Sequence, residues 1–227
     1  MINSFHLKLA SLKRHLLGGD SKIIREYLNN NQNPMLHLGC GGRLIADWLN
    51  TDINPSNTIA FLDARKSFPF RDNTFVACYS EHMLEHIDFF SAKHCINEIY
   101  RTLRPGGFVR LVTPDLDKLI SLCCSPRDSL SEAYITYMSK TFEIVPCTPY
   151  GILNAHFRLW GHTYLFDKTT LAGLLVDAGF TLVKSMHLDE SCSPHMGNLS
   201  NKDRYPDNLL DYESFVLEAI KPPLLSD

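Results

Sequence analysis

Residues 35–42 read Met-Leu-His-Leu-Gly-Cys-Gly-Gly, a short apolar run that stops at a cluster of glycines. Met35 to Leu38 predicts a buried β-strand, and the glycines predict a tight turn at its carboxyl end. Such a turn lets backbone amides approach a ligand closely. A short helix expected from Arg43 to Trp48 would direct its positive end at a carboxylate or phosphate. The stretch therefore predicts a ligand site where the first strand of an α/β sheet ends.

Strand-like runs alternate with helix-like patterns along the rest of the chain. A helix is expected around Ser21 to Leu28, before the first strand. Further strands are expected at 49–53, 58–62, 74–79, 108–112, 180–186 and 215–220, and further helices at 89–103, 117–123, 130–142 and 168–178. This alternation is typical of stacked βα units. We therefore predict a Rossmann-like, doubly wound α/β fold with a mostly parallel seven-stranded sheet that ends in an antiparallel hairpin.

The length of 227 residues and the hydrophobic content of 44% predict one globular domain, residues 1–227. Within it, residues 1–33 are expected to form an N-terminal helical segment. Residues 116–166 have a weaker periodicity and are expected to form an insertion that covers the substrate. A loop in that insertion would carry Asn154, His156, Arg158, Trp160 and His162.

The net charge and the cysteines indicate which kind of substrate the protein binds and in which cellular compartment it lies. The net charge of −3 gives no broad attraction to nucleic acid or anionic lipid, so a small or neutral substrate fits better. Seven cysteines without C-x-x-C spacing indicate neither a disulfide framework nor a zinc site, and predict a reducing, cytoplasmic location. No transmembrane segment is expected. Met1 to Leu17 mixes leucines with basic residues and would pack on the domain or a partner, with peripheral membrane contact as the alternative.

Two acids, Asp52 and Asp63, end the second and third expected strands. A dinucleotide site is disfavoured, because Leu44 stands where its third glycine is required and Asp52 follows Gly39 by only 13 residues. Asp52 could accept hydrogen bonds from two ribose hydroxyls, and Asp63 could accept one from the amine of adenine. A nucleoside with an amino-acid tail would satisfy both acids and the glycine turn.

Five motifs follow one another between Met35 and Ile220: His37-Leu38-Gly39-Cys40-Gly41-Gly42, Trp48-Leu49-Asn50-Thr51-Asp52, Phe68-Pro69-Phe70-Arg71-Asp72-Asn73-Thr74-Phe75, Leu84-Glu85-His86 and Leu103-Arg104-Pro105-Gly106-Gly107. Their order resembles the class I S-adenosylmethionine-dependent methyltransferases. The resemblance implies S-adenosyl-L-methionine as the cofactor, with contacts from Gly39, Cys40, Gly41, Asp52, Ile53, Asp63, Ala64, Ser80 and Glu81. Two positions depart from the family: His37 stands where many members have an acid, and Arg43 where a third glycine is frequent.

The resemblance also implies attack by a substrate heteroatom on the sulfonium methyl group. A hydroxyl acceptor would benefit from a base near neutrality, for which we select His162 and then His82. The run His162-x-Tyr164-x-Phe166 resembles a stretch of bacterial small-molecule and glycan methyltransferases. A small-molecule or glycan-related hydroxyl is therefore the expected acceptor, with substrate contacts from His86, His156, Arg158, Trp160 and Tyr164.

Three alternatives stay open. The acceptor could be a nitrogen or carbon atom of a metabolite, or the chain could be a methyltransferase fold that binds cofactor without turnover. The run His82-x-x-Glu85-His86 resembles the Glu-x-x-Glu-His metal site of some quinone and RNA-end methyltransferases. Because Leu-Glu-His also occurs in many metal-free relatives, the sequence predicts no bound metal.

Overall fold

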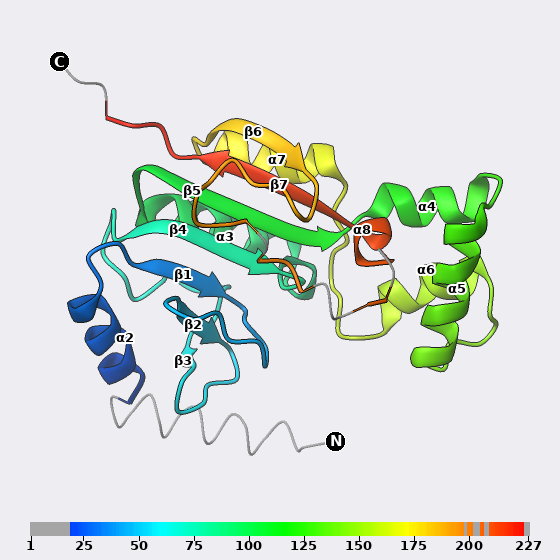
Figure 1. Ribbon diagram of the computed structural model, residues 1–227, viewed down its shortest axis with the longest axis horizontal. Helices are drawn as coiled ribbons and strands as arrows, with labels where there is room; N and C mark the ends of the chain where they lie inside the picture. Colours follow the sequence, from blue (N-terminus) through cyan, green and yellow to red (C-terminus); the bar gives the residue numbers. More distant parts are fainter. Residues whose placement is uncertain (1–18, 198, 202–204, 207–208, 225–227) are drawn as a thin grey trace.

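The computed structural model describes residues 19–197, 199–201, 205–206 and 209–224, so what was predicted for residues 1–18 lies outside the described residues. Within these residues, seven strands form one sheet in the order β3-β2-β1-β4-β5-β7-β6 (Figure 1). The strands are β1 (Met35–Leu38), β2 (Leu49–Asp52), β3 (Ala60–Phe61), β4 (Phe75–Glu81), β5 (Leu103–Pro114), β6 (Thr181–Met186) and β7 (Ser214–Ile220). Only β7 runs antiparallel to its neighbours, β5 and β6. The predicted Rossmann-like, mostly parallel sheet with an antiparallel hairpin is confirmed.

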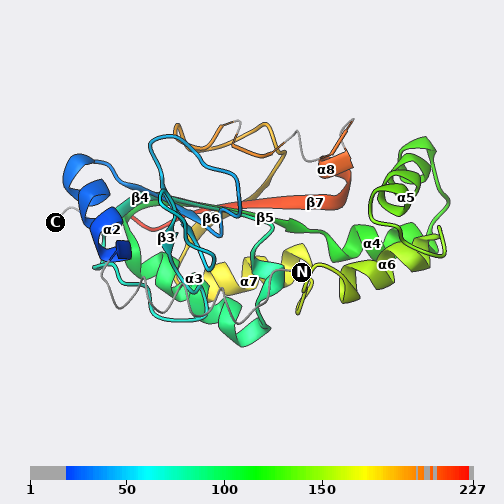
Figure 2. The same cartoon turned by 90° about the horizontal axis from the view of Figure 1, so that it is seen from below.

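The helices lie in two groups around the sheet. They are α2 (Gly19–Asn30), the short 3-10 helix η1 (Leu84–His86), α3 (Phe89–Thr102), α4 (Leu116–Cys124), α5 (Ser129–Thr141), α6 (Pro149–Arg158), α7 (Lys168–Asp177) and α8 (Leu209–Glu213). Figure 2 shows α3 and α7 beneath the sheet, and α4, α5 and α6 as a lobe beyond the ends of β4 and β5. None of the described helices is long and apolar enough to cross a membrane.

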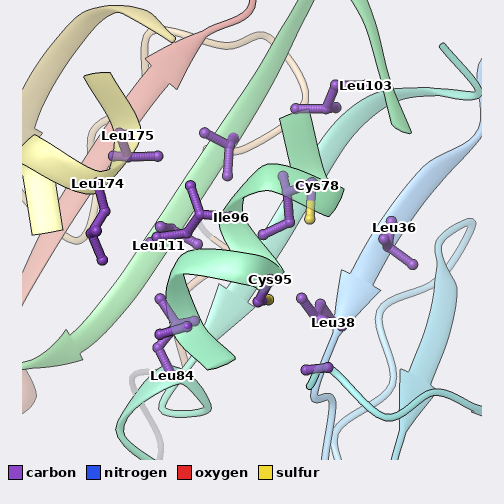
Figure 3. Close-up of a cluster of buried hydrophobic side chains, with 14 of the residues drawn as sticks. Leu36, Leu38, Cys78, Leu84, Cys95, Ile96, Leu103, Leu111, Leu174 and Leu175 are labelled. Carbon is purple, nitrogen blue, oxygen red and sulfur yellow. The ribbon is translucent and has the colours of Figure 1, made fainter. Parts of the chain in front are cut away.

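Helix α3 illustrates how the sequence produces this packing. Asp88 caps its first turn by accepting hydrogen bonds from the amides of Phe90 and Ser91. Apolar residues then recur every three or four positions, so that they line one face of the helix. That face includes Cys95 and Ile96, which have no exposed surface and lie against strand residues such as Leu38 and Leu111 in the core (Figure 3). The buried face of α3 therefore anchors the loop that precedes it, which carries η1.

The helix predicted at 43–48 is absent, and this prediction was wrong. Asn50, on β2, takes over the hydrogen bonds that a helix would have made. Its Oδ1 accepts the amide of Ile45 at 2.9 Å, and its Nδ2 donates to the carbonyls of Ile45 and Trp48 at 2.9 and 3.0 Å. Asp47 has a φ of +63°, which bends the chain back toward β2. A buried side chain thus stabilises a loop where local sequence favoured a helix.

The prediction of a loop around residues 154–162 was also wrong, because α6 extends to Arg158. The helix begins with two strong start signals: Thr148 accepts a hydrogen bond from the amide of Gly151, and Pro149 occupies the first helical position. Asn154, His156 and Arg158 are therefore helical, and the chain turns only at Trp160 and Gly161. The short α8 was not predicted either.

Arg110, on β5, ties the segment after β6 to the sheet. Its side chain has no exposed surface and pairs with Glu218 of β7, with Nη1 to Oε1 at 2.7 Å. The same guanidinium donates to the carbonyls of His187, Leu188 and Glu190 at 2.6 to 3.3 Å. Glu218 Oε2 in turn accepts the amide of Cys192 at 2.7 Å. One buried ion pair therefore positions the chain that crosses the face of the sheet opposite α3 and α7.

We predict that Arg110→Leu lowers the free energy of unfolding by about 3–5 kcal/mol, because it leaves the Glu218 carboxylate buried without a partner. Urea denaturation measures the change. The matched control is Lys93→Ala, which breaks an exposed pair with Asp177 and should cost no more than about 1 kcal/mol. Equal effects from both variants would contradict the role of Arg110.

Candidate active site

The glycine turn after β1 has the conformation that the sequence predicted. Gly39 and Gly41 have φ values of +69° and +56°, in the left-handed region that favours glycine. A Cβ atom on Gly39 would lie 2.7 Å from Cβ of Met83 and closer still to its Cγ, whereas a Cβ on Gly41 would meet open space. The amide of Cys40 donates to the carbonyl of Thr51 at 3.0 Å. The turn therefore packs against the loop after β4 on one side and opens to ligand at Gly41.

Asp52, at the end of β2, holds this turn in place. Its Oδ2 accepts the amide of Gly41 at 2.9 Å, and its Oδ1 accepts the amide of Asn54 at 2.8 Å. The carboxylate thus joins the ends of two adjacent strands, a role that the sequence analysis did not predict. Each oxygen retains further acceptor capacity for ligand hydroxyls.

Asp63 and Ala64 line the same hollow as Asp52, but Asp63 has a partner that the sequence analysis missed. Arg65 donates to it through Nε and Nη2, both at 2.8 Å, and this pairing lowers the pKa of Asp63. An adenine amine would therefore share the carboxylate with Arg65. The hollow is a cavity of about 170 Å³, lined by Leu38, Gly39, Asp52, Ile53, Leu62, Asp63, Ala64, Arg65, Met83, His86 and Ile87.

Ser80 and Glu81 end β4 and have different environments. The Ser80 hydroxyl is buried and donates to the carbonyl of Leu38 at 3.0 Å, so it joins β4 to β1. Glu81 pairs with Arg43 at 3.2 Å and accepts the amide of Asn201 at 3.1 Å. A wider, more open hollow of about 600 Å³ lies here, lined by His37, Gly39, Cys40, Gly41, Gly42, Arg43, Glu81, His82 and Asn201. No local sequence signal indicated Asn201, which the fold brings in from a distant segment.

His37, at the third position of β1, is a buried neutral group. Burial lowers its pKa to about 4, and its Nδ1 lies 2.9 Å from Oδ1 of Asn50. The ring also packs on Tyr79, with centroids 5.4 Å apart. His37 therefore contributes no negative charge to the glycine turn near neutral pH.

His162, the first candidate base, lies beside His86 just after the α6 helix. Its Nδ1 donates to the carbonyl of His156 at 2.7 Å, which leaves Nε2 with a free lone pair. Burial lowers the pKa of His162, so the ring is neutral at pH 7. The rings of His86 and His162 meet edge to face with centroids 5.0 Å apart. Since His86 also lines the cavity with Asp52 and Asp63, His86 and His162 connect the lobe to that cavity.

His82, the second candidate base, uses both ring nitrogens within the protein. Nδ1 lies 3.2 Å from Oε1 of Glu85, and Nε2 lies 3.1 Å from the hydroxyl of Ser214. Burial alone would raise the pKa of Glu85, but the interactions with His82 outweigh it and lower that pKa to about 2. The 8% exposure of His82 and its contacts indicate that it is a positioning residue rather than the expected base.

Most of the expected substrate-contacting residues do not converge on the cleft. His156 is 1% exposed and its Nε2 lies 2.9 Å from the hydroxyl of Tyr134, so its ring belongs to the interior of the lobe. Trp160 packs on Phe142, and Tyr164 packs on the core. Arg158 lines a separate groove between α6 and residues 143–146, which precede it. The predicted loop would have exposed His156 and Arg158, whereas the α6 helix directs them to the lobe interior and to that groove.

Comparisons with known proteins bear on the fold. Residues 36–111 match the family described as "Methyltransferase domain". No curated protein matches the chain. An S-adenosylmethionine-dependent methyltransferase from Mesorhizobium loti is 13% identical over 82% of this chain and 90% of that chain, with a TM-score of 0.50.

Two further solved structures have the same kind of similarity. A SAM-dependent methyltransferase from Archaeoglobus fulgidus is 14% identical over 96% of this chain and 100% of that chain, with a TM-score of 0.48. Phosphoethanolamine N-methyltransferase 2 from Haemonchus contortus, in complex with S-adenosyl-L-methionine, is 16% identical over 89% of this chain, with a TM-score of 0.45. This chain spans 52% of that protein's chain. At such identities the similarity of the three concerns the fold alone.

We predict that Gly39→Ala destabilises the protein more than Gly41→Ala does. Both substitutions place a Cβ atom at a positive φ, which lowers the free energy of unfolding by about 1–3 kcal/mol. Only the methyl group at residue 39 also collides with Met83. Thermal unfolding of the two variants measures the difference. Gly42→Ala, with open space and no positive φ, is the control and should leave the melting temperature unchanged. Equal melting temperatures for all three variants would show that Met83 does not constrain the turn.

Proposed function

We propose that this chain, which carries a methyltransferase domain on the class I fold as the sequence predicted, transfers a methyl group from S-adenosylmethionine to a small-molecule or glycan-related hydroxyl. One observation carries the proposal. A single cavity is lined by Gly39, Asp52 and Asp63 and also by His86, which contacts His162. The cavity thus joins a nucleoside-binding set of groups to a pair of histidines.

The cofactor orientation follows from the chemistry of these groups. The amides of Cys40 and Gly41 already donate to Thr51 and Asp52, so the open side of the turn at Gly41 and Gly42, beside Arg43, suits the carboxylate of the methionine portion. Asp52 suits the two ribose hydroxyls. Ile53 and Ala64 offer apolar surface to adenine, beside the Asp63 carboxylate. Arg43 adds a positive charge at the turn, where the helix N-terminus expected from the sequence does not exist.

The acceptor would approach from the side of the histidines. As the oxygen attacks the methyl carbon, the carbon–sulfur bond breaks and the hydroxyl proton must leave. We propose that His162 assists this loss, because its Nε2 lone pair is free and its ring is half-buried near the cavity rim. His86 would contact the acceptor, and His82 would hold Glu85 in position. Alignment of the two reactants would supply much of the acceleration.

The cysteines support the proposal of a reducing, cytoplasmic location. All seven are unpaired, and Cys40, Cys78 and Cys95 are buried within the fold. Burial raises the pKa of Cys40 to about 11, which keeps this thiol of the glycine turn protonated and unreactive.

Cofactor binding is tested by isothermal titration with S-adenosylhomocysteine. We expect the wild-type protein to bind it and Asp52→Asn to bind at least about tenfold more weakly, because the variant loses charged hydrogen bonds to ribose. Asp177→Asn, an exposed position on α7, is the matched control and should bind as the wild type does. A wild-type protein that binds no S-adenosylhomocysteine would refute the proposed cofactor.

The acceptor class is tested with His162→Ala in an assay that follows radiolabelled methyl transfer to fractionated cell extract. For a hydroxyl acceptor we expect the rate to fall about 10²–10⁴-fold while S-adenosylhomocysteine affinity is retained. A variant that keeps its rate would favour a nitrogen or carbon acceptor. Binding of S-adenosylhomocysteine without transfer to any fraction would favour a non-catalytic protein.

A further inference from the structure

We propose that Glu85, His86 and His162 bind a divalent transition-metal ion that holds the acceptor oxygen. The inference rests on the proposed function and refines the part that His162 plays in it. Each of the three residues offers one ligand atom, and these atoms lie within 4.8 Å of one another. The sequence alone predicted no bound metal, because Leu-Glu-His also occurs in many metal-free relatives, and the fold adds His162 to that run.

Glu85 is the strongest element of this site. It has no exposed surface, and Thr113 donates to its Oε2 at 3.1 Å. Its Oε1 has no partner in the described residues that meets hydrogen-bond geometry, although Nδ1 of His82 is 3.2 Å away. A buried carboxylate oxygen without a proper partner is costly, and a cation beside it would remove that cost.

The two histidines are suitably prepared as ligands. Nδ1 of His162 donates to the carbonyl of His156, which fixes the tautomer and directs the lone pair of Nε2 outward. This is the usual support of a metal-bound histidine. His86 is exposed at the cavity rim, so its ring can rotate toward the ion. Rotation is required, because ligand atoms at metal–ligand distances of about 2.0–2.2 Å lie closer together than 4.8 Å.

His82 lies outside the ligand set despite its place in the sequence motif. Its Nε2 lies 3.1 Å from the hydroxyl of Ser214, and its Nδ1 lies 3.2 Å from Oε1 of Glu85, outside hydrogen-bond geometry. It would instead orient the Glu85 carboxylate from behind. Two imidazoles and one carboxylate suit ions such as Fe²⁺, Co²⁺ or Zn²⁺, and they leave coordination positions open for a substrate.

The ion would activate the acceptor as a Lewis acid. A hydroxyl oxygen bound to it has a lower pKa, so its proton passes to water. The oxygen lone pair then forms the bond to the methyl carbon, the carbon–sulfur bond breaks, and neutral S-adenosylhomocysteine leaves. In this scheme His162 assists the loss of the proton by holding the ion.

The test is a titration of the full chain, freed of metal with EDTA, with Co²⁺ followed by visible absorption. We expect one equivalent bound by the wild type and an affinity at least about tenfold lower in His86→Ala and Glu85→Gln. His195→Ala, an exposed position outside the cluster, is the matched control and should bind as the wild type does. Any binding to the exposed cysteines cancels in these comparisons, and thermal unfolding verifies that each variant is folded.

Failure of this inference is distinguishable from failure of the proposed function. Equal Co²⁺ affinity in the wild type and folded His86→Ala, or no Co²⁺ bound at all, would overturn the metal site. Methyl transfer that withstands EDTA would then leave the proposed function intact. Conversely, the expected Co²⁺ result in a protein that binds no S-adenosylhomocysteine would support the metal site and refute the proposed function.

Discussion

The geometry of the site depends on the contacts of the buried residue Glu85. The Glu85 side chain contacts His82 and Thr113, which lie on or beside two neighbouring strands. The backbone carbonyl of Glu85 accepts the amides of Thr163 and Tyr164 at 2.7 and 3.2 Å. A charge without exposed surface must keep such partners, because breaking a buried pair leaves a desolvated ion. The residue therefore fixes the chain after α6, and with it His162, against the end of β4.

Side chains, rather than a following helix, hold the glycine turn and the loop after it in place. Asn50 satisfies the backbone of the loop after the turn, and Asp52 accepts the amide of Gly41. No helix dipole is available there to attract a carboxylate. Arg43 is the nearby positive charge instead, held by Glu81.

The wider hollow is completed from the far end of the chain. Arg110 and Glu218 bind the backbone of residues 187–192, and the segment that continues from them brings the amide of Asn201 to Glu81. The boundary of the wider hollow therefore depends on an ion pair inside the sheet.

Local sequence determined a large part of this protein. Strand periodicity predicted the sheet, the terminal hairpin and the strand ends near Gly39, Asp52 and Asp63. The Asp167 cap and the glycine at 179 predicted the bounds of α7. These features depend on neighbours along the chain, so the sequence records them directly.

Only the tertiary structure decided which polar groups meet. It pairs Asp63 with Arg65, places Ser214 beside Nε2 of His82, buries His156 and brings His162 to Glu85 and His86. The loop after β1 is non-helical because a side chain on the next strand binds its backbone. The contacts of His82 with Ser214, of His156 with Tyr134 and of His162 with Glu85 join residues far apart in the chain. Neither periodicity nor spacing contains information about them.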